Sequence, residues 1–187
     1  MEWFDKNAAA IIAASAALSA SLLAGVFALL GAWANHIFTN KRFKNQIEID
    51  ERKENKKLYI EKGEELHSLL IKWGNVAFAN FLTDQGYLTG RLTKAQSHEL
   101  MKDKYNAETF TRISTLIAIY FPELKSDFEK VRDIPLQASS YVDKYEANIL
   151  PKQQACDLHN GKSAAFDPLL THIKETLQKS ILRHLKG

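Results

Sequence analysis

Three histidines of this sequence lie a few residues after a side chain that could act with them. Their spacings are those found in catalytic or metal-binding motifs. Cys156 precedes His159 by three residues, and a thiol beside an imidazole base is the pairing behind nucleophilic cysteine catalysis. Glu64 precedes His67 by three residues, which is half of a di-iron ligand set in a helical bundle. No other histidine has a glutamate three residues before it. We therefore predict no catalytic residue, no metal site and no cofactor here.

The third pair is Arg91 and His98, with six residues between them. Arginine binds phosphate oxygens, and histidine exchanges protons near neutral pH. The pair resembles the Arg-x4–6-His motif of all-helical HEPN-type ribonucleases, in which these residues bind phosphate and act as acid and base at the RNA 2′-hydroxyl. The resemblance covers eight positions and implies an RNA-cleaving enzyme as an alternative function. Arg91 falls in a predicted turn, so we expect alanine at either position to leave the function intact.

Charge is distributed very unevenly along the 187 residues. Asp, Glu, Lys and Arg make up 25% of the chain, but none of them occurs from Asn7 to Asn40. The net charge of +3 is too small to indicate a nucleic-acid partner. A single cysteine excludes an intramolecular disulfide framework and a cysteine-cluster metal site.

The uncharged stretch predicts a transmembrane helix over residues 8–38. A helix needs about 20 apolar residues to cross a bilayer, and the apolar run from Ala8 to Ala34 is longer than that. A cleaved signal peptide is the alternative. However, Glu2 and Asp5 outnumber Lys6 in the first residues, where a signal peptide carries net positive charge, and the run exceeds the usual apolar region of a signal. We therefore expect a retained anchor.

Basic residues at the two ends of this segment predict its orientation. Lys6 is the basic residue on the N-terminal side, whereas Lys41, Arg42 and Lys44 follow the segment immediately. Because the more basic flank stays in the cytoplasm, we expect residues 1–7 outside the cytoplasm and the C-terminal part inside it. Lys41, Arg42 and Lys44 are predicted to contact lipid headgroups.

Small residues recur every four positions in the predicted anchor. Such rows let two helix backbones approach closely in lipid, so they predict a helix-packing face and a homo-oligomer. The alternative is that an alanine-rich segment contains such rows by composition alone. The predicted face consists of Ala16, Ala20, Ala24, Gly25 and Ala28.

The charged part of the chain predicts a helical stalk over residues 39–57 and a helical domain over 58–187. One apolar face runs from Leu58 to Phe81, and a turn is expected at 84–90. Further helices are expected from Thr93 to Tyr120, broken near Asn106, from Pro122 to Ile149, and from Phe166 onward, after a polar loop over 152–163. No strand pattern competes with them. The expected fold is all-α, an antiparallel bundle of about four helices.

These features favour a non-enzymatic single-pass membrane protein. Its cytoplasmic bundle would self-associate or recruit a protein partner at the bilayer. Two alternatives remain open at this point. One is a membrane-perturbing effector triggered through its cytoplasmic domain, and the other is a membrane-tethered HEPN-like ribonuclease.

Overall fold

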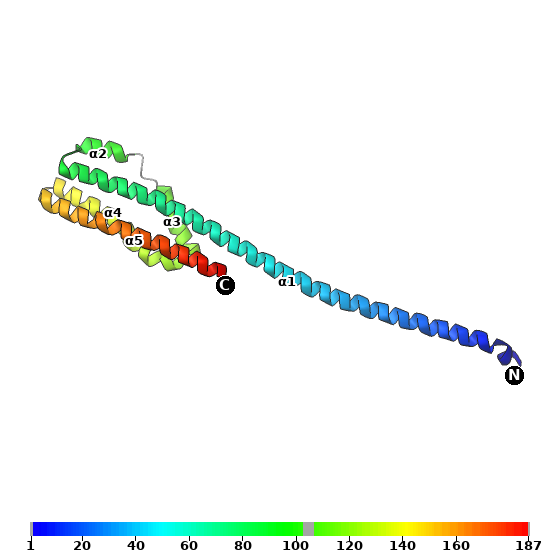
Figure 1. The fold of residues 1–187 in the computed structure, drawn as a ribbon. Coiled ribbons are helices and arrows are strands. Elements are labelled where there is room, and N and C mark those ends of the chain that lie inside the picture. Colours follow the sequence, from blue (N-terminus) through cyan, green and yellow to red (C-terminus); the bar gives the residue numbers. More distant parts are fainter. Residues whose placement is uncertain (1, 103–106, 187) are drawn as a thin grey trace. The chain divides into compact units, whose positions relative to one another are not determined.

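The computed structural model describes residues 2–102 and 107–186. Within these ranges the chain forms helices and turns without a β-strand, which confirms the all-α prediction. The α-helices and the 3-10 helix η1 are α1 (Glu2–Thr89), α2 (Lys94–Met101), α3 (Ala107–Tyr120), η1 (Pro122–Leu124), α4 (Lys125–Glu146) and α5 (Lys152–Lys186) (Figure 1). The chain divides into two compact units, Met1–Glu54 and Asn55–Gly187.

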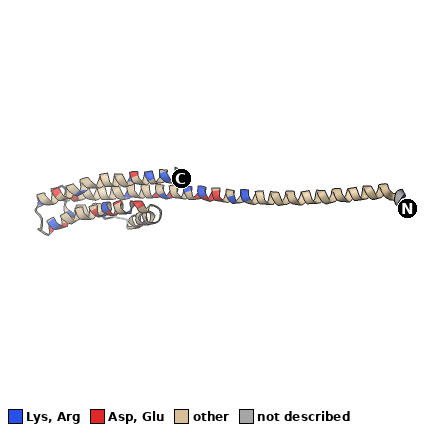
Figure 2. Ribbon diagram, turned by 90° about the horizontal axis from the view of Figure 1, so that it is seen from below, with Lys and Arg blue, Asp and Glu red and all other residues tan. Residues whose placement is uncertain are grey.

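The N-terminal unit is the first part of α1. Its stretch from residue 7 to residue 40 carries no charged side chain and is drawn entirely in tan in Figure 2. Alanine and leucine, which dominate this stretch, are the strongest helix formers, and no proline interrupts it. Among the described residues, α1 is the one helix long and apolar enough to cross a membrane, and no residue of its most apolar stretch is buried.

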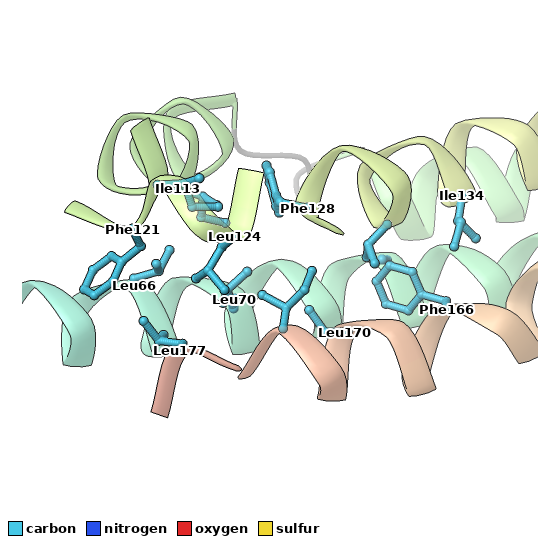
Figure 3. Close-up of a cluster of buried hydrophobic side chains, with 14 of the residues drawn as sticks. Leu66, Leu70, Ile113, Phe121, Leu124, Phe128, Ile134, Phe166, Leu170 and Leu177 are labelled. Atoms are coloured by element: carbon cyan, nitrogen blue, oxygen red, sulfur yellow. The ribbon is translucent and has the colours of Figure 1, made fainter. Parts of the chain in front are cut away.

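The C-terminal unit is held together by one large hydrophobic core. Its side chains come from α1, α3, η1, α4 and α5, and a part of them is drawn in Figure 3. Leu66 and Leu70 of α1 lie among Ile113 of α3, Leu124 of η1 and Leu177 of α5, all essentially inaccessible to solvent. Burying a side chain of this kind contributes about 1.5–3 kcal/mol. The unit therefore has a core of its own.

Within this unit, α5 runs opposite in direction to α1. At one end, the Lys56 ammonium donates to the Leu185 carbonyl at 3.0 Å, and the Tyr59 hydroxyl lies 3.0 Å from the Ser180 hydroxyl. At the other end, the ring of Phe81 meets the His159 ring edge-on. Low residue numbers of α1 therefore pair with high numbers of α5.

Helix α4 follows the direction of α1. Trp73 packs on Phe128, the Asn80 amide donates to the Ser139 hydroxyl at 2.9 Å, and Tyr87 meets Tyr145. The numbers on both helices rise together. Helices α4 and α5 also pack extensively on each other, so α1, α4 and α5 surround a common core.

Two predicted helix starts are confirmed. Thr93 caps α2: its hydroxyl accepts the backbone N–H of Gln96, and the Gln96 side chain accepts the backbone N–H of Thr93. Pro122 occupies the first position of η1, where its missing N–H costs no hydrogen bond. The predicted break near Asn106 falls outside the described residues, but α2 and α3 are separate helices on either side of it.

The turn expected over residues 84–90 is shorter in the structure than the sequence predicts. Helix α1 continues through Gly86 to Thr89, and the turn begins at Gly90, whose φ of 82° is readily adopted by glycine. Gly86 has a packing role instead. A side-chain carbon there would come within 2.8 Å of the Leu92 side chain, which folds back over the end of the helix.

The polar loop expected over 152–163, and the helix start expected at Phe166, are wrong. Helix α5 begins at Lys152 and continues past Gly161 and Pro168. Tertiary packing supplies the reason. Ala155, His159 and Phe166 recur at helical spacing and are all buried, so the early turns of α5 contribute to the interior despite their polar composition.

Candidate functional site

The apolar part of α1 is the most unusual surface of the described chain. Leu22, Phe27, Leu29 and Trp33 are more than half exposed, as are most large apolar residues between Ile12 and Phe38. Monomeric soluble proteins rarely expose a continuous apolar surface of this size. This segment of α1 is therefore suited to contact lipid or another apolar surface.

The predicted helix-packing face lies on this surface. Ala16, Ala20, Ala24, Gly25 and Ala28 are all exposed in the helix. A side-chain carbon built on Gly25 would meet nothing within 4 Å. The small residues therefore pack against no other part of the described chain, and their surface is accessible to a second helix.

The three basic residues after the apolar segment are exposed as well. Lys41, Arg42 and Lys44 form no ion pair with any residue that the structure describes. Further along, mixed charges pair weakly on the helix surface, as between Lys53 and Asp50 at 3.9 Å. Lys41, Arg42 and Lys44 therefore form an exposed basic cluster directly after the uncharged stretch.

A second feature is a polar cluster inside the C-terminal unit. The Asn80 amide donates to the Ser139 hydroxyl, and the Ser139 hydroxyl donates to Asp84 Oδ2, both at 2.9 Å. His159 Nε2 lies 3.7 Å from the same Asp84 oxygen. The four residues come from α1, α4 and α5, so the cluster links three helices.

Sequence reasoning missed this cluster. The local sequence pattern predicts a turn at Asp84 and a loop at His159, so it does not bring the two residues together. The His159 ring is 1% exposed, and neither of its nitrogens has a hydrogen-bond partner among the described residues. A buried polar group without a partner costs free energy. A helical reading of residues 152–163 would have shown that His159 lies one turn after Ala155 on the buried face.

Cys156 and His159 make no hydrogen bond or ion pair with each other in the part of the chain that the structure describes. Cys156 is half-buried and packs against a small apolar cluster that contains Leu88 and Val142. The charged group nearest to His159 is the carboxylate of Asp84. Within the described part of the chain Cys156 has no hydrogen bond to a base, which an activated thiol requires.

Arg91 and His98 lie on different elements. Arg91 follows Gly90 in the turn, and His98 lies near the end of α2; both are exposed. Neither side chain makes a hydrogen bond or ion pair with a described residue. His98 lines a shallow groove with Lys94, but Lys94 Nζ lies 2.5 Å from Glu146 Oε2. This hydrogen bond raises the pKa of Lys94, so its charge is already paired.

Glu64 and His67 line a groove between α1 and α5, together with Glu175. Across residues 2–102 and 107–186 no three His, Cys, Asp or Glu side chains lie close enough to hold a metal ion. The neighbouring Glu65 has a different role. It accepts from Arg112 Nε at 2.5 Å and from Lys62 Nζ at 2.9 Å. These hydrogen bonds lower the Glu65 pKa to about 2, so the pair ties α1 to α3.

Comparison with known proteins does not narrow the range of possible functions. No protein-family model, curated protein or solved structure matches this chain. The features on which a function can be argued are the exposed apolar segment of α1, the basic cluster after it, and the C-terminal unit with its own core.

Proposed function

We propose that this chain is a non-enzymatic, single-pass membrane protein. Residues 8–38 would cross the bilayer, and residues 58–187 would form a cytoplasmic helical domain that self-associates or recruits a protein partner there. The observation that carries the proposal is the uncharged segment of α1, which is long enough to span and has its large apolar side chains exposed.

Free energy favours lipid around this segment. Each large apolar side chain gains about 1.5–3 kcal/mol on leaving water, and residues 8–38 expose more than ten of them. The core of the C-terminal unit consists of side chains from its own residues, none of which lies in this segment. The bilayer supplies a cover of matching length.

The proposed orientation and topology follow from charge and helix direction. Exposed Lys41, Arg42 and Lys44 would lie at the cytoplasmic headgroups. In the C-terminal unit, α1 and α5 run in opposite directions and α4 follows α1. We therefore propose an antiparallel bundle of about four helices, in which α2 and α3 together form the remaining one.

The non-enzymatic part of the proposal is supported by the surroundings of the reactive residues. Cys156 contacts apolar side chains, His159 is enclosed, and Arg91 and His98 stand on separate exposed elements. An acid–base or nucleophilic site needs several such groups within hydrogen-bond reach of one another. A domain with a core of its own, and with no such set among its described residues, is suited to binding and assembly.

Alkaline carbonate extraction of membranes that contain the full chain tests the anchor. We expect the protein to stay in the membrane pellet, and a variant lacking residues 8–38 to appear in the supernatant. A reporter fused after Gly187 should read as cytoplasmic. Full-length protein in the supernatant would contradict the anchor, and a reporter active on the outer side would contradict the orientation.

A further inference from the structure

A cleft of about 260 Å³ lies between α1, α3 and α4 in the C-terminal unit. Its walls are mainly apolar and include Trp73 of α1, Phe110 of α3, and Pro135 and Leu136 of α4. Ligand sites in proteins are commonly clefts in which a few polar groups stand among apolar walls. The cleft is therefore a candidate site for a small ligand.

Polar side chains mark the two ends of this cleft. Lys72 and Asn80 of α1 both line it, and they are separated by about 12 Å of helix at about 1.5 Å per residue. At the far end, the Asn80 amide donates to the Ser139 hydroxyl at 2.9 Å, which joins α1 to α4. The stretch between the two ends is apolar, so the cleft is elongated and has a different chemistry at its ends than along its length.

The charges near the two ends are opposite in sign. Lys72 is exposed and forms no hydrogen bond or ion pair with a residue that the structure describes. Behind Asn80, the carboxylate of Asp84 accepts from the Ser139 hydroxyl at 2.9 Å, and its side chain is 13% exposed. A ligand anion is attracted by the Lys72 ammonium and repelled by the Asp84 carboxylate. The Lys72 end is therefore the one that suits an anionic group.

The dimensions of the cleft favour a single unbranched chain. Its volume of about 260 Å³, spread over about 12 Å, leaves a mean cross-section of about 20 Å². A helix of a partner protein is about 10–12 Å in diameter and is too wide for this space. An extended hydrocarbon chain is narrow enough, and each methylene that it buries against the apolar walls adds to its affinity.

We propose that the cleft binds the anion of a medium-chain fatty acid. The carboxylate pairs with Lys72, and the hydrocarbon chain runs past Trp73 and Leu136 towards Asn80. Because the side chains of Asn80 and Ser139 are hydrogen-bonded to each other, a methyl terminus beside them leaves that hydrogen bond intact. The site lies within the C-terminal unit, so it does not depend on the proposed membrane span.

Fluorescence of Trp73 tests the site in the full-length protein. Trp3→Phe and Trp33→Phe leave Trp73 as the remaining tryptophan of the chain, and Trp73 lines the cleft. Titration of this protein in lipid nanodiscs with decanoate should move the Trp73 emission to shorter wavelength and saturate at a single decanoate per chain. An emission that stays constant, or that changes without saturation as lipid partitioning would give, overturns the proposal.

Lys72→Gln tests the position of the carboxylate. We expect it to weaken decanoate binding by about two- to fivefold, the range for an exposed ion pair, and to leave the binding of uncharged decanol unchanged. The matched control is Lys179→Gln, an exposed lysine of α5 that does not line the cleft, and it should bind decanoate like the wild type. An equal loss for decanol, or an equal loss in Lys179→Gln, overturns the pairing with Lys72.

Val76→Phe tests the location of the chain. Val76 is half-buried and lines the cleft, so an added ring there should abolish saturable binding while circular dichroism shows unchanged helicity. Chain length gives an independent test on the protein without this substitution. Hexanoate should bind more weakly than decanoate, and tetradecanoate should bind little more tightly, because the Asn80–Ser139 hydrogen bond closes the far end. Affinity that keeps rising with chain length overturns the proposal.

Discussion

His159 of α5 and Asp84 of α1 face each other inside the C-terminal unit, with His159 Nε2 3.7 Å from Asp84 Oδ2. This distance is too long for a hydrogen bond. The Asp84 carboxylate instead accepts from Ser139 at 2.9 Å, and the imidazole is enclosed by packing against Phe81. In this structure His159 therefore fills space rather than completing a hydrogen-bond network.

Substitutions of His159 distinguish these two roles. His159→Ala should destabilise the protein by about 2–4 kcal/mol, because it leaves a cavity among packed side chains. His159→Leu keeps most of the volume and removes two unpaired nitrogens, so we expect a loss of less than about 1.5 kcal/mol. Urea unfolding followed by circular dichroism measures both. A leucine variant as unstable as the alanine variant would contradict the space-filling role. It would show that the imidazole stabilises the protein through a polar interaction.

The Glu65–Arg112 pair predicts how stability depends on pH. Hydrogen bonds from Arg112 and Lys62 lower the Glu65 pKa from 4.5 to about 2 in the folded protein. A carboxylate with a lowered pKa stabilises the fold above its unfolded pKa, and this contribution is lost as the pH falls from about 4.5 towards 2. Glu65→Gln should therefore lower stability at pH 7 and flatten the loss of stability in acid.

Glu61→Gln is the matched control for that measurement. Glu61 is exposed, and its Oε1 lies 3.9 Å from Lys57 Nζ. An exposed ion pair at this distance contributes little to the stability of the fold. Unfolding curves at pH 7 and at several acid pH values compare the three proteins. If Glu61→Gln changes the pH dependence as much as Glu65→Gln does, the Arg112 contact has no special effect.

The small-residue face of α1 predicts the effect of added bulk in the membrane. Ala24→Leu and Gly25→Leu should weaken self-association, because a large side chain separates two backbones that pack closely in lipid. Val26→Ala and Leu29→Ala should have less effect, and all four variants stay apolar enough to insert. Cross-linking in membranes gives the readout. Unchanged dimer in both leucine variants would mean that the rows reflect composition.

Arg91 and His98 offer a direct test of the enzymatic alternative. Both side chains are exposed and make no hydrogen bond or ion pair with a described residue, so Arg91→Ala and His98→Ala should fold and reach the membrane like the wild type. We expect purified wild-type protein and both variants to leave single-stranded RNA intact. Cleavage by the wild type that His98→Ala abolishes would contradict the non-enzymatic proposal.

The sequence by itself determined the features that depend on neighbouring residues. Thr93 and Gln96 cap a helix because their side chains reach each other's backbone over three positions. Pro122 begins a helix because its ring sets the backbone angle. The uncharged run of α1 is visible because composition decides whether a helix can span a bilayer. None of these features requires a partner from elsewhere in the chain.

Only the tertiary structure decided where α5 begins, how far α1 extends, and which polar residues share the interior. Lys152 to Ser163 contains glycine and few apolar residues, so its local pattern favours a loop. Burial of Ala155 and His159 against α1 and α4 outweighs that weak preference. Asp84, Ser139 and His159 meet because three helices bring together positions far apart in the sequence, and no local spacing records such a contact.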